Sequence, residues 1–65
     1  MAEDATAALD ALARAEELSV AQGLTRERSR IHFLRGNLLF PQGRMDECLV
    51  EHSTALELAR SARSP

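Results

Sequence analysis

The segment ALDALARAEELSVAQGL at residues 8–24 recurs in altered form forty positions later, as CLVEHSTALELARSARS at residues 48–64. The two copies are identical at several aligned positions: Leu9 with Leu49, Ala15 with Ala55, Glu17 with Glu57, and Leu18 with Leu58. A period of this length, with helices separated by short turns, is typical of an α-solenoid, whose units stack because none buries its apolar face alone. The internal repeat therefore predicts an all-α fold.

Turn residues between the two copies enclose a further helical segment. Gly23 is a natural left-handed stop for the first helix, and the hydroxyl of Thr25 can cap the first turn of the next one. Pro41 lacks a backbone donor and disfavours helical geometry at Phe40, so the second helix should end near residue 39 or 40. We predict one domain over residues 1–65, with helices at about residues 4–22, 26–40 and 45–62.

Each predicted helix carries apolar residues at helical spacing. They are Ala5, Ala8, Leu9, Leu12, Ala15 and Leu18 in the first helix, and Ile31, Leu34 and Leu38 in the second. In the third helix, one seam is formed by Met45, Leu49, His52, Leu56 and Ala59, with Cys48, Ala55 and Leu58 beside it. The side chains that we expect to be largely buried are Leu9, Leu12, Ile31, Leu34, Leu38, Leu49, Leu56 and Leu58.

Size, charge and cysteine content narrow the class of protein. A chain of 65 residues forms one small domain, and so small a core generally needs neighbours for stability. The net charge of -2 gives no broad reason to expect nucleic acid or an acidic membrane as a partner. The lone cysteine, Cys48, excludes an internal disulfide and suits a reducing compartment. With neither a secretory signal nor a long apolar run in the sequence, we expect a cytoplasmic protein.

The stretch RGNLLFPQGRMDECL at residues 35–49, followed by ALEL at residues 55–58, resembles a tetratricopeptide repeat. The matching positions are Gly36, Leu39, Gly43, Asp46, Glu47 and Cys48 and the Ala55-Leu56-Glu57-Leu58 run. The forty-residue period is similar to that of the longer arrays found in large bacterial regulators. The resemblance implies an antiparallel hairpin over residues 25–62, preceded by one leading helix. That is about one and a half repeats, a fragment of an α-solenoid.

Two registers are open for the second helix. Alignment on Gly36 places His32 and Arg35 where the family has large apolar residues. Alignment on Ile31, Leu34 and Leu38 instead restores the apolar pattern, with one extra residue in the following turn. We expect the second register, because burial constrains a helix face more than turn length does.

A second row of side chains on this helix is the candidate binding surface. The resemblance implies that the first helix of each hairpin lines a groove that faces a ligand. The residues of this helix that fall on the groove lie opposite much of the expected buried face; they are Arg30, Phe33, Asn37 and Phe40. The partner would be a protein or a peptide. The alternative is that the aromatic side chains pack against another repeat or another copy of the chain.

Other kinds of site have weaker support in the sequence. Cys48 and His52 lie four apart on one helix face and could provide two ligands of a metal, but a zinc site needs three or four. We expect both residues to serve only in the packing of the helices, and we expect no metal and no cofactor. The arginines of the second helix form no single stripe along which nucleic acid could lie. No nucleophile has a base and an oxyanion-forming loop beside it, so we expect no enzyme.

We therefore expect a module for protein–protein interaction that is part of a longer scaffold or sensor array. The first alternative is a self-associating helical bundle. The second is a small metal- or nucleic-acid-binding module. Because both ends of the repeat would expose apolar stripes, we also expect a homo-oligomer, most simply a dimer.

Overall fold

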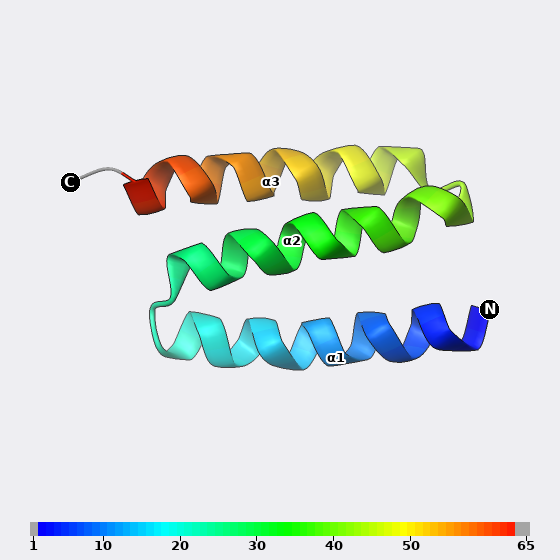
Figure 1. The fold of residues 1–65 in the computed structure, drawn as a ribbon, viewed down its shortest axis with the longest axis horizontal. Coiled ribbons are helices and arrows are strands. Elements are labelled where there is room, and N and C mark those ends of the chain that lie inside the picture. Colours follow the sequence, from blue (N-terminus) through cyan, green and yellow to red (C-terminus); the bar gives the residue numbers. More distant parts are fainter. Residues whose placement is uncertain (1, 64–65) are drawn as a thin grey trace.

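The computed structural model describes residues 2–63, with side chains from residue 5 onward. Three α-helices lie antiparallel and side by side: α1 (Ala2–Ala21), α2 (Thr25–Leu39) and α3 (Met45–Arg63) (Figure 1). A 3-10 turn, η1 (Phe40–Gln42), joins α2 to α3. The prediction of an all-α fold is confirmed, and the helix ends differ from the expected ones by at most two residues.

The helices form a single layer rather than a closed bundle. The molecule measures 40 × 21 × 11 Å along its principal axes, so its thickness is about the diameter of one helix. The middle helix, α2, packs extensively on α3 and less extensively on α1, while α1 and α3 have no comparable interface of their own. Both broad faces of the layer are therefore open.

Two glycines make the turns, each in the left-handed conformation that other residues rarely adopt. Gly23 has φ +69°, and the amides of Gly23 and Leu24 donate to the carbonyls of Val20 and Ser19. Gly43, with φ +75°, ends η1 in the same way. This paired pattern satisfies free carbonyls at a helix end, as expected for Gly23. The cap expected from Thr25 is wrong: Leu24 occupies that position, and no side chain caps the start of α2.

The register expected for α2 is also wrong. The residues of α2 that are buried are Ile31, His32, Gly36 and Leu39. Leu34 is 42% exposed, so the buried face of α2 is the one that contains Gly36 rather than Leu34. The physical reason lies in its neighbours. Gly36 lets α3 approach so closely that a Cβ at this position would overlap the ring of His52, and charged groups from α1 and α3 surround His32.

The seam expected on α3 is displaced around the helix. Its buried residues are Cys48 and Ala55, while Leu49 and Leu56 are 57% and 53% exposed. Cys48 and Ala55 are small, and this allows α2 and α3 to pack closely. The leucines that we expected in the core, Leu49 and Leu56, lie beside this contact and have no helix over them among the described residues.

The first helix follows its expected stripe only in part. Its half-buried apolar residues are Ala5, Ala8, Leu9, Leu12 and Ala15. Near its C-terminal end Leu18 is exposed and Ser19 is buried instead. Within the described residues, none of the helices combines the length and the apolar character needed to cross a bilayer.

Candidate functional site

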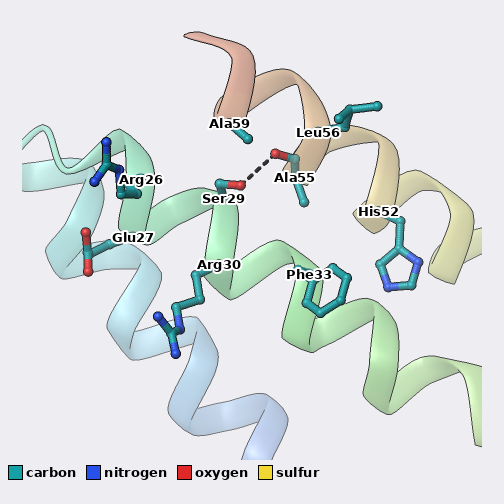
Figure 2. Close-up of a pocket in the computed structure, with 9 residues that line it drawn as sticks. All are labelled: Arg26, Glu27, Ser29, Arg30, Phe33, His52, Ala55, Leu56 and Ala59. Carbon is teal, nitrogen blue, oxygen red and sulfur yellow. Dashed lines mark hydrogen bonds between the residues drawn. The ribbon is translucent and has the colours of Figure 1, made fainter. Parts of the chain in front are cut away.

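A hollow between α2 and α3, the α2–α3 groove, has a volume of about 620 Å³ (Figure 2). From α2 it is lined by Arg26, Glu27, Ser29, Arg30 and Phe33, and from α3 by His52, Ala55, Leu56 and Ala59. The hydroxyl of Ser29 donates to the carbonyl of Ala55 (2.7 Å) and ties the two walls together. An apolar floor with arginines at one end could receive an apolar side chain that is followed by a polar or acidic group.

A second hollow, the α1–α2 groove, lies on the other side of α2 and has a volume of about 510 Å³. It is lined by Ala8, Ala11, Leu12, Ala15, Leu34, Asn37 and Leu38, none of which is charged. Arg30, Phe33, Leu34 and Asn37 follow the spacing i, i+3, i+4, i+7 and therefore lie on one side of α2. Both grooves thus open on the same side of the layer, which we call the front face.

Phe33 and His52 form the wall of the α2–α3 groove at its other end. Their rings stack, with centroids 5.2 Å apart and an angle of 27° between the planes. Nε2 of His52 lies 3.1 Å from Oδ1 of Asn37, which accepts its hydrogen. The remaining nitrogen, Nδ1, lies 3.8 Å from the sulfur of Cys48 and can accept from the thiol. The imidazole is thereby fixed on three sides and holds Phe33 in place.

The arginines of α2 divide between the two faces of the layer, as their spacing predicted. The side chains of Arg26 and Arg30 are exposed at the end of the groove and make no hydrogen bond or ion pair with another side chain among the described residues. Arg35 instead points into a polar network, and the Nε atom of Arg28 is buried without a partner. The free cationic groups on the front face are therefore available to a ligand.

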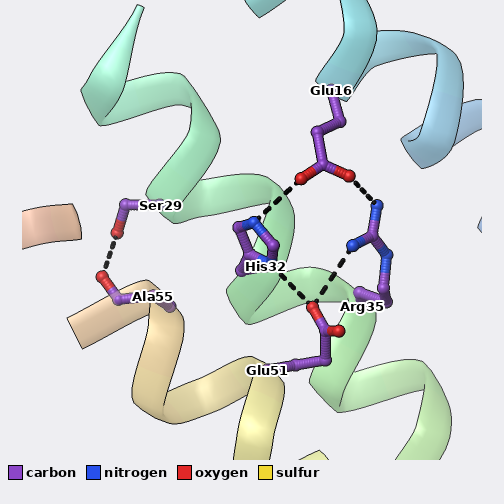
Figure 3. A network of polar contacts seen from close by, with 6 residues as sticks. All are labelled: Glu16, Ser29, His32, Arg35, Glu51 and Ala55. Carbon is purple, nitrogen blue, oxygen red and sulfur yellow. Dashed lines mark hydrogen bonds and ion pairs between the residues drawn. The ribbon is translucent and has the colours of Figure 1, made fainter. Parts of the chain in front are cut away.

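A network of four polar side chains joins all three helices opposite the front face (Figure 3). Arg35 on α2 binds Glu16 of α1 (2.8 Å) and Glu51 of α3 (3.3 Å). His32 lies between the same two carboxylates, with Nε2 3.0 Å from Glu16 and Nδ1 2.7 Å from Glu51. All four side chains are less than one-third exposed. The network ties α1 and α3 together through α2.

The ion pair between Arg35 and Glu16 favours the charged forms of these two groups. The hydrogen bond from Arg35 lowers the pKa of Glu16 below its ordinary value, against an opposing effect of burial. Burial by itself lowers the pKa of Arg35, but the hydrogen bond and charge of Glu16, and the charge of Glu51, outweigh it, so that this pKa is raised. Because its polar groups are paired with one another across three helices, the network joins the helices rather than forming a ligand site.

The four candidate groove residues do not meet in one hollow. Arg30 and Phe33 line the α2–α3 groove, and Asn37 lines the α1–α2 groove while binding His52. Phe40 is exposed at the end of α2 and lines neither groove. The sequence interpretation missed the lining residues of α3, because it placed Leu56 in the core. It also missed the network, whose signal was two polar residues, His32 and Arg35, at positions where alignment on Gly36 would place large apolar residues.

Cys48 and His52 lie side by side but have no further ligand near them. Cys48 is buried, and the described residues contain no group of three or more histidine, cysteine, aspartate or glutamate side chains that could hold a metal ion. The thiol has the imidazole of His52 as its hydrogen-bond partner, which fits a packing role for Cys48. Its small size fits the close contact between α2 and α3.

Comparison with known protein families, with curated proteins and with solved structures found no match to this chain.

Proposed function

We propose that this chain is a protein–protein interaction module of about one and a half tetratricopeptide-like repeats, without catalytic activity and acting in the cytoplasm. Its front face binds a segment of another polypeptide. An apolar side chain of the partner enters the α2–α3 groove between Phe33 and Leu56. Arg26 and Arg30 face polar or acidic groups beside that anchor.

The observation that carries this proposal is the combination of an open apolar groove with unpaired arginines at one end. Phe33 is exposed, yet it is held in place by its stacking on His52. A rigid, exposed aromatic side chain loses little entropy when a partner covers it, and such residues dominate the energetics of protein interfaces. Apolar lining with a few placed polar groups is also what binding sites for other molecules commonly present.

A selection from a displayed library of random peptides tests the proposal, because the natural ligand need not be known. Selected peptides are synthesised with a fluorophore, and their affinity is measured by anisotropy for the wild type and for Phe33→Ser and Leu56→Ser. We expect each groove variant to weaken binding roughly tenfold or more, as expected when an anchor contact is lost.

Val50→Ser is the matched control for Leu56→Ser. Val50 is an exposed apolar residue of the same helix, but it lies beside Asp46, Glu47 and Glu51 and lines neither front-face groove. Peptides should bind this variant with wild-type affinity. Peptides that bind all variants equally, or a selection that yields no binder, would contradict the proposed function.

A further inference from the structure

A stripe of exposed apolar side chains runs along α3 at the edge of the front face. Met45, Leu49 and Leu56 form it, at a spacing that keeps them on one side of the helix. Through the internal repeat, Leu49 and Leu56 correspond to Leu9 and Glu16 of α1. Leu9 is half-buried and Glu16 binds α2 directly, so the equivalent side of α1 packs on a helix. On α3 the same side has no helix against it within the described residues.

We propose that a second copy of this chain covers this stripe, with the two α3 helices antiparallel about a twofold axis that passes beside His52 and Ser53. The inference rests on the proposed function in one respect: it uses the same front face, and it makes a second copy of the chain the partner that binds there. The contact is self-complementary, as a twofold interface must be.

The sequence of α3 is matched to this arrangement. Leu49 and Leu56 are equally distant from the proposed axis, so that Leu49 of each copy faces the partner's Leu56. The apolar stripe is therefore continuous across the interface. Ala59 and His52, which lie between the stripe and α2, leave room for the partner helix over the α2–α3 groove.

Charge decides the relative direction of the two helices. The first turn of α3 contains Asp46 and Glu47, and its last turn contains Arg60 and Arg63. In an antiparallel pair, the acidic turn of one copy lies beside the basic turn of the other. A parallel pair would bring acidic turns together and basic turns together, and would also align the helix dipoles unfavourably.

The exposed apolar area is sufficient for a stable dimer. Phe33 and Phe40 are 52% and 58% exposed, and with the three residues of the α3 stripe they make five side chains that each leave on the order of 100 Å² in contact with water. The sum is about 500 Å² per copy. A standard interface buries about 800 Å² per partner, of which about 60% is apolar, so the two quantities agree.

Sedimentation of the whole chain at micromolar concentration tests the inference. We expect the wild type to sediment as a dimer. The double variant Leu49→Glu/Leu56→Glu should raise the dissociation constant by roughly 100-fold or more, because the dimer would have to bury unpaired carboxylates. Val50→Glu adds a charge to an equally exposed position (62%) away from the stripe and should remain dimeric. Helicity measured by circular dichroism monitors the fold of each variant.

Disulfide trapping tests the direction of the pair independently of these variants. In a Cys48→Ala background, one preparation carries Leu49→Cys and another Leu56→Cys. Mild oxidation of the mixture should give covalent dimers containing one copy of each, several times faster than either preparation alone. Val50→Cys is the control and should cross-link slowly.

Three results would overturn the inference: a monomeric wild type, a dimer unaffected by the double glutamate variant, or faster cross-linking within each preparation than between them. Its failure is distinguishable from failure of the proposed function. A monomer that still binds selected peptides through Phe33 and Leu56 would refute the dimer alone. Because the second copy lies over the α2–α3 groove, the peptide selection is repeated on the single variant Leu49→Glu, which weakens the dimer without changing a groove residue. A wild-type dimer, together with no peptide that binds this variant through the groove, would refute the peptide-binding proposal alone.

Discussion

Replacement of Glu16 by glutamine tests whether the network on the side opposite the front face stabilises the fold. The change keeps the shape of the side chain but removes the charge that faces Arg35 at 2.8 Å and His32 at 3.0 Å. A hydrogen bond to a charged group contributes about 1.5–3 kcal/mol. Because 27% of the Glu16 side chain remains exposed, screening reduces this value, and we expect Glu16→Gln to cost about 1–2 kcal/mol at pH 7.

The same variant has a defined pH dependence. The pKa of Glu16 is lowered in the folded state from an ordinary value of 4.5. A lowered folded-state pKa stabilises the protein above the ordinary value, and this stabilisation is lost as the pH falls through the folded pKa. The difference between wild type and Glu16→Gln should therefore be full at neutral pH and should shrink in acid, as Glu16 itself becomes protonated.

Thermal melting followed by circular dichroism at a series of pH values measures this effect. For a domain of this size, the expected loss corresponds to a Tm lower by roughly 5–15 °C at pH 7. Glu17→Gln is the matched control, since Glu17 is the exposed neighbour on α1 and has no part in the network. Equal melting of the two variants at pH 7, or a difference that persists unchanged in strong acid, would refute the stabilising role of the network.

Three further predictions concern the packing of α2 on α3. Leu39→Ala should lower the free energy of unfolding by about 2–5 kcal/mol because Leu39 is buried, whereas Leu34→Ala should lower it by less than about 1 kcal/mol because Leu34 is exposed. Equal losses of stability in urea denaturation would contradict the buried face assigned to α2. Gly36→Ala should destabilise the wild type, because the added Cβ displaces the ring of His52. In a His52→Ala background the same change should stabilise the protein by up to about 1 kcal/mol through helix propensity, so a double-mutant cycle without coupling would be inconsistent with the close approach of α2 and α3. Cys48→Ala should lower the free energy of unfolding by no more than about 1 kcal/mol, and zinc should leave the Tm of the wild type unchanged. A zinc-induced rise in Tm that His52→Ala abolishes would instead indicate a metal site.

Local features of the fold could be predicted from the sequence because single residues decide them. The left-handed turn at Gly23 follows from backbone sterics, and the end of α2 before Pro41 follows from the missing amide hydrogen. Phe40 nevertheless keeps right-handed helical geometry, because η1 continues the chain as one tighter turn. The number of helices and their approximate ends therefore required no knowledge of tertiary contacts.

The rotation of each helix about its axis could not be predicted in the same way. On α2, the face centred on Ile31, Leu34 and Leu38 and the face that contains Ile31, Gly36 and Leu39 differ by a rotation of roughly 100°, about one residue of the helix, and the first is the more apolar. The second is adopted because Gly36 permits close packing and because partners on two other helices neutralise the polar side chains that it buries. Such compensation joins residues up to 19 positions apart and has no signature in a local pattern.

For the candidate site, sequence and structure agree on the exposed row of α2 but not on what lies opposite. Phe33 and Asn37 were expected to face outward, and both are exposed. Their common partner, His52, was expected in a buried seam, so neither the stacked ring pair nor the groove wall was foreseen. Leu56 was likewise expected in the core, although it lines the groove. Apolar residues that recur every 3.6 positions identify an apolar side of a helix, but this spacing does not show whether another helix covers that side.

The placement of α2 between two helices that share no extensive interface has a consequence for folding and for native-state fluctuations. Each interface joins helices that are consecutive in the chain, so contacts form between near neighbours and folding should be fast. The free energy of unfolding is then close to a sum of helix terms and nearest-neighbour terms. Since α1 has the smaller interface, it can detach while the α2–α3 hairpin stays folded. Amide hydrogens of α1 would exchange through this local opening, and those at the α2–α3 contact only through the opening of the whole domain.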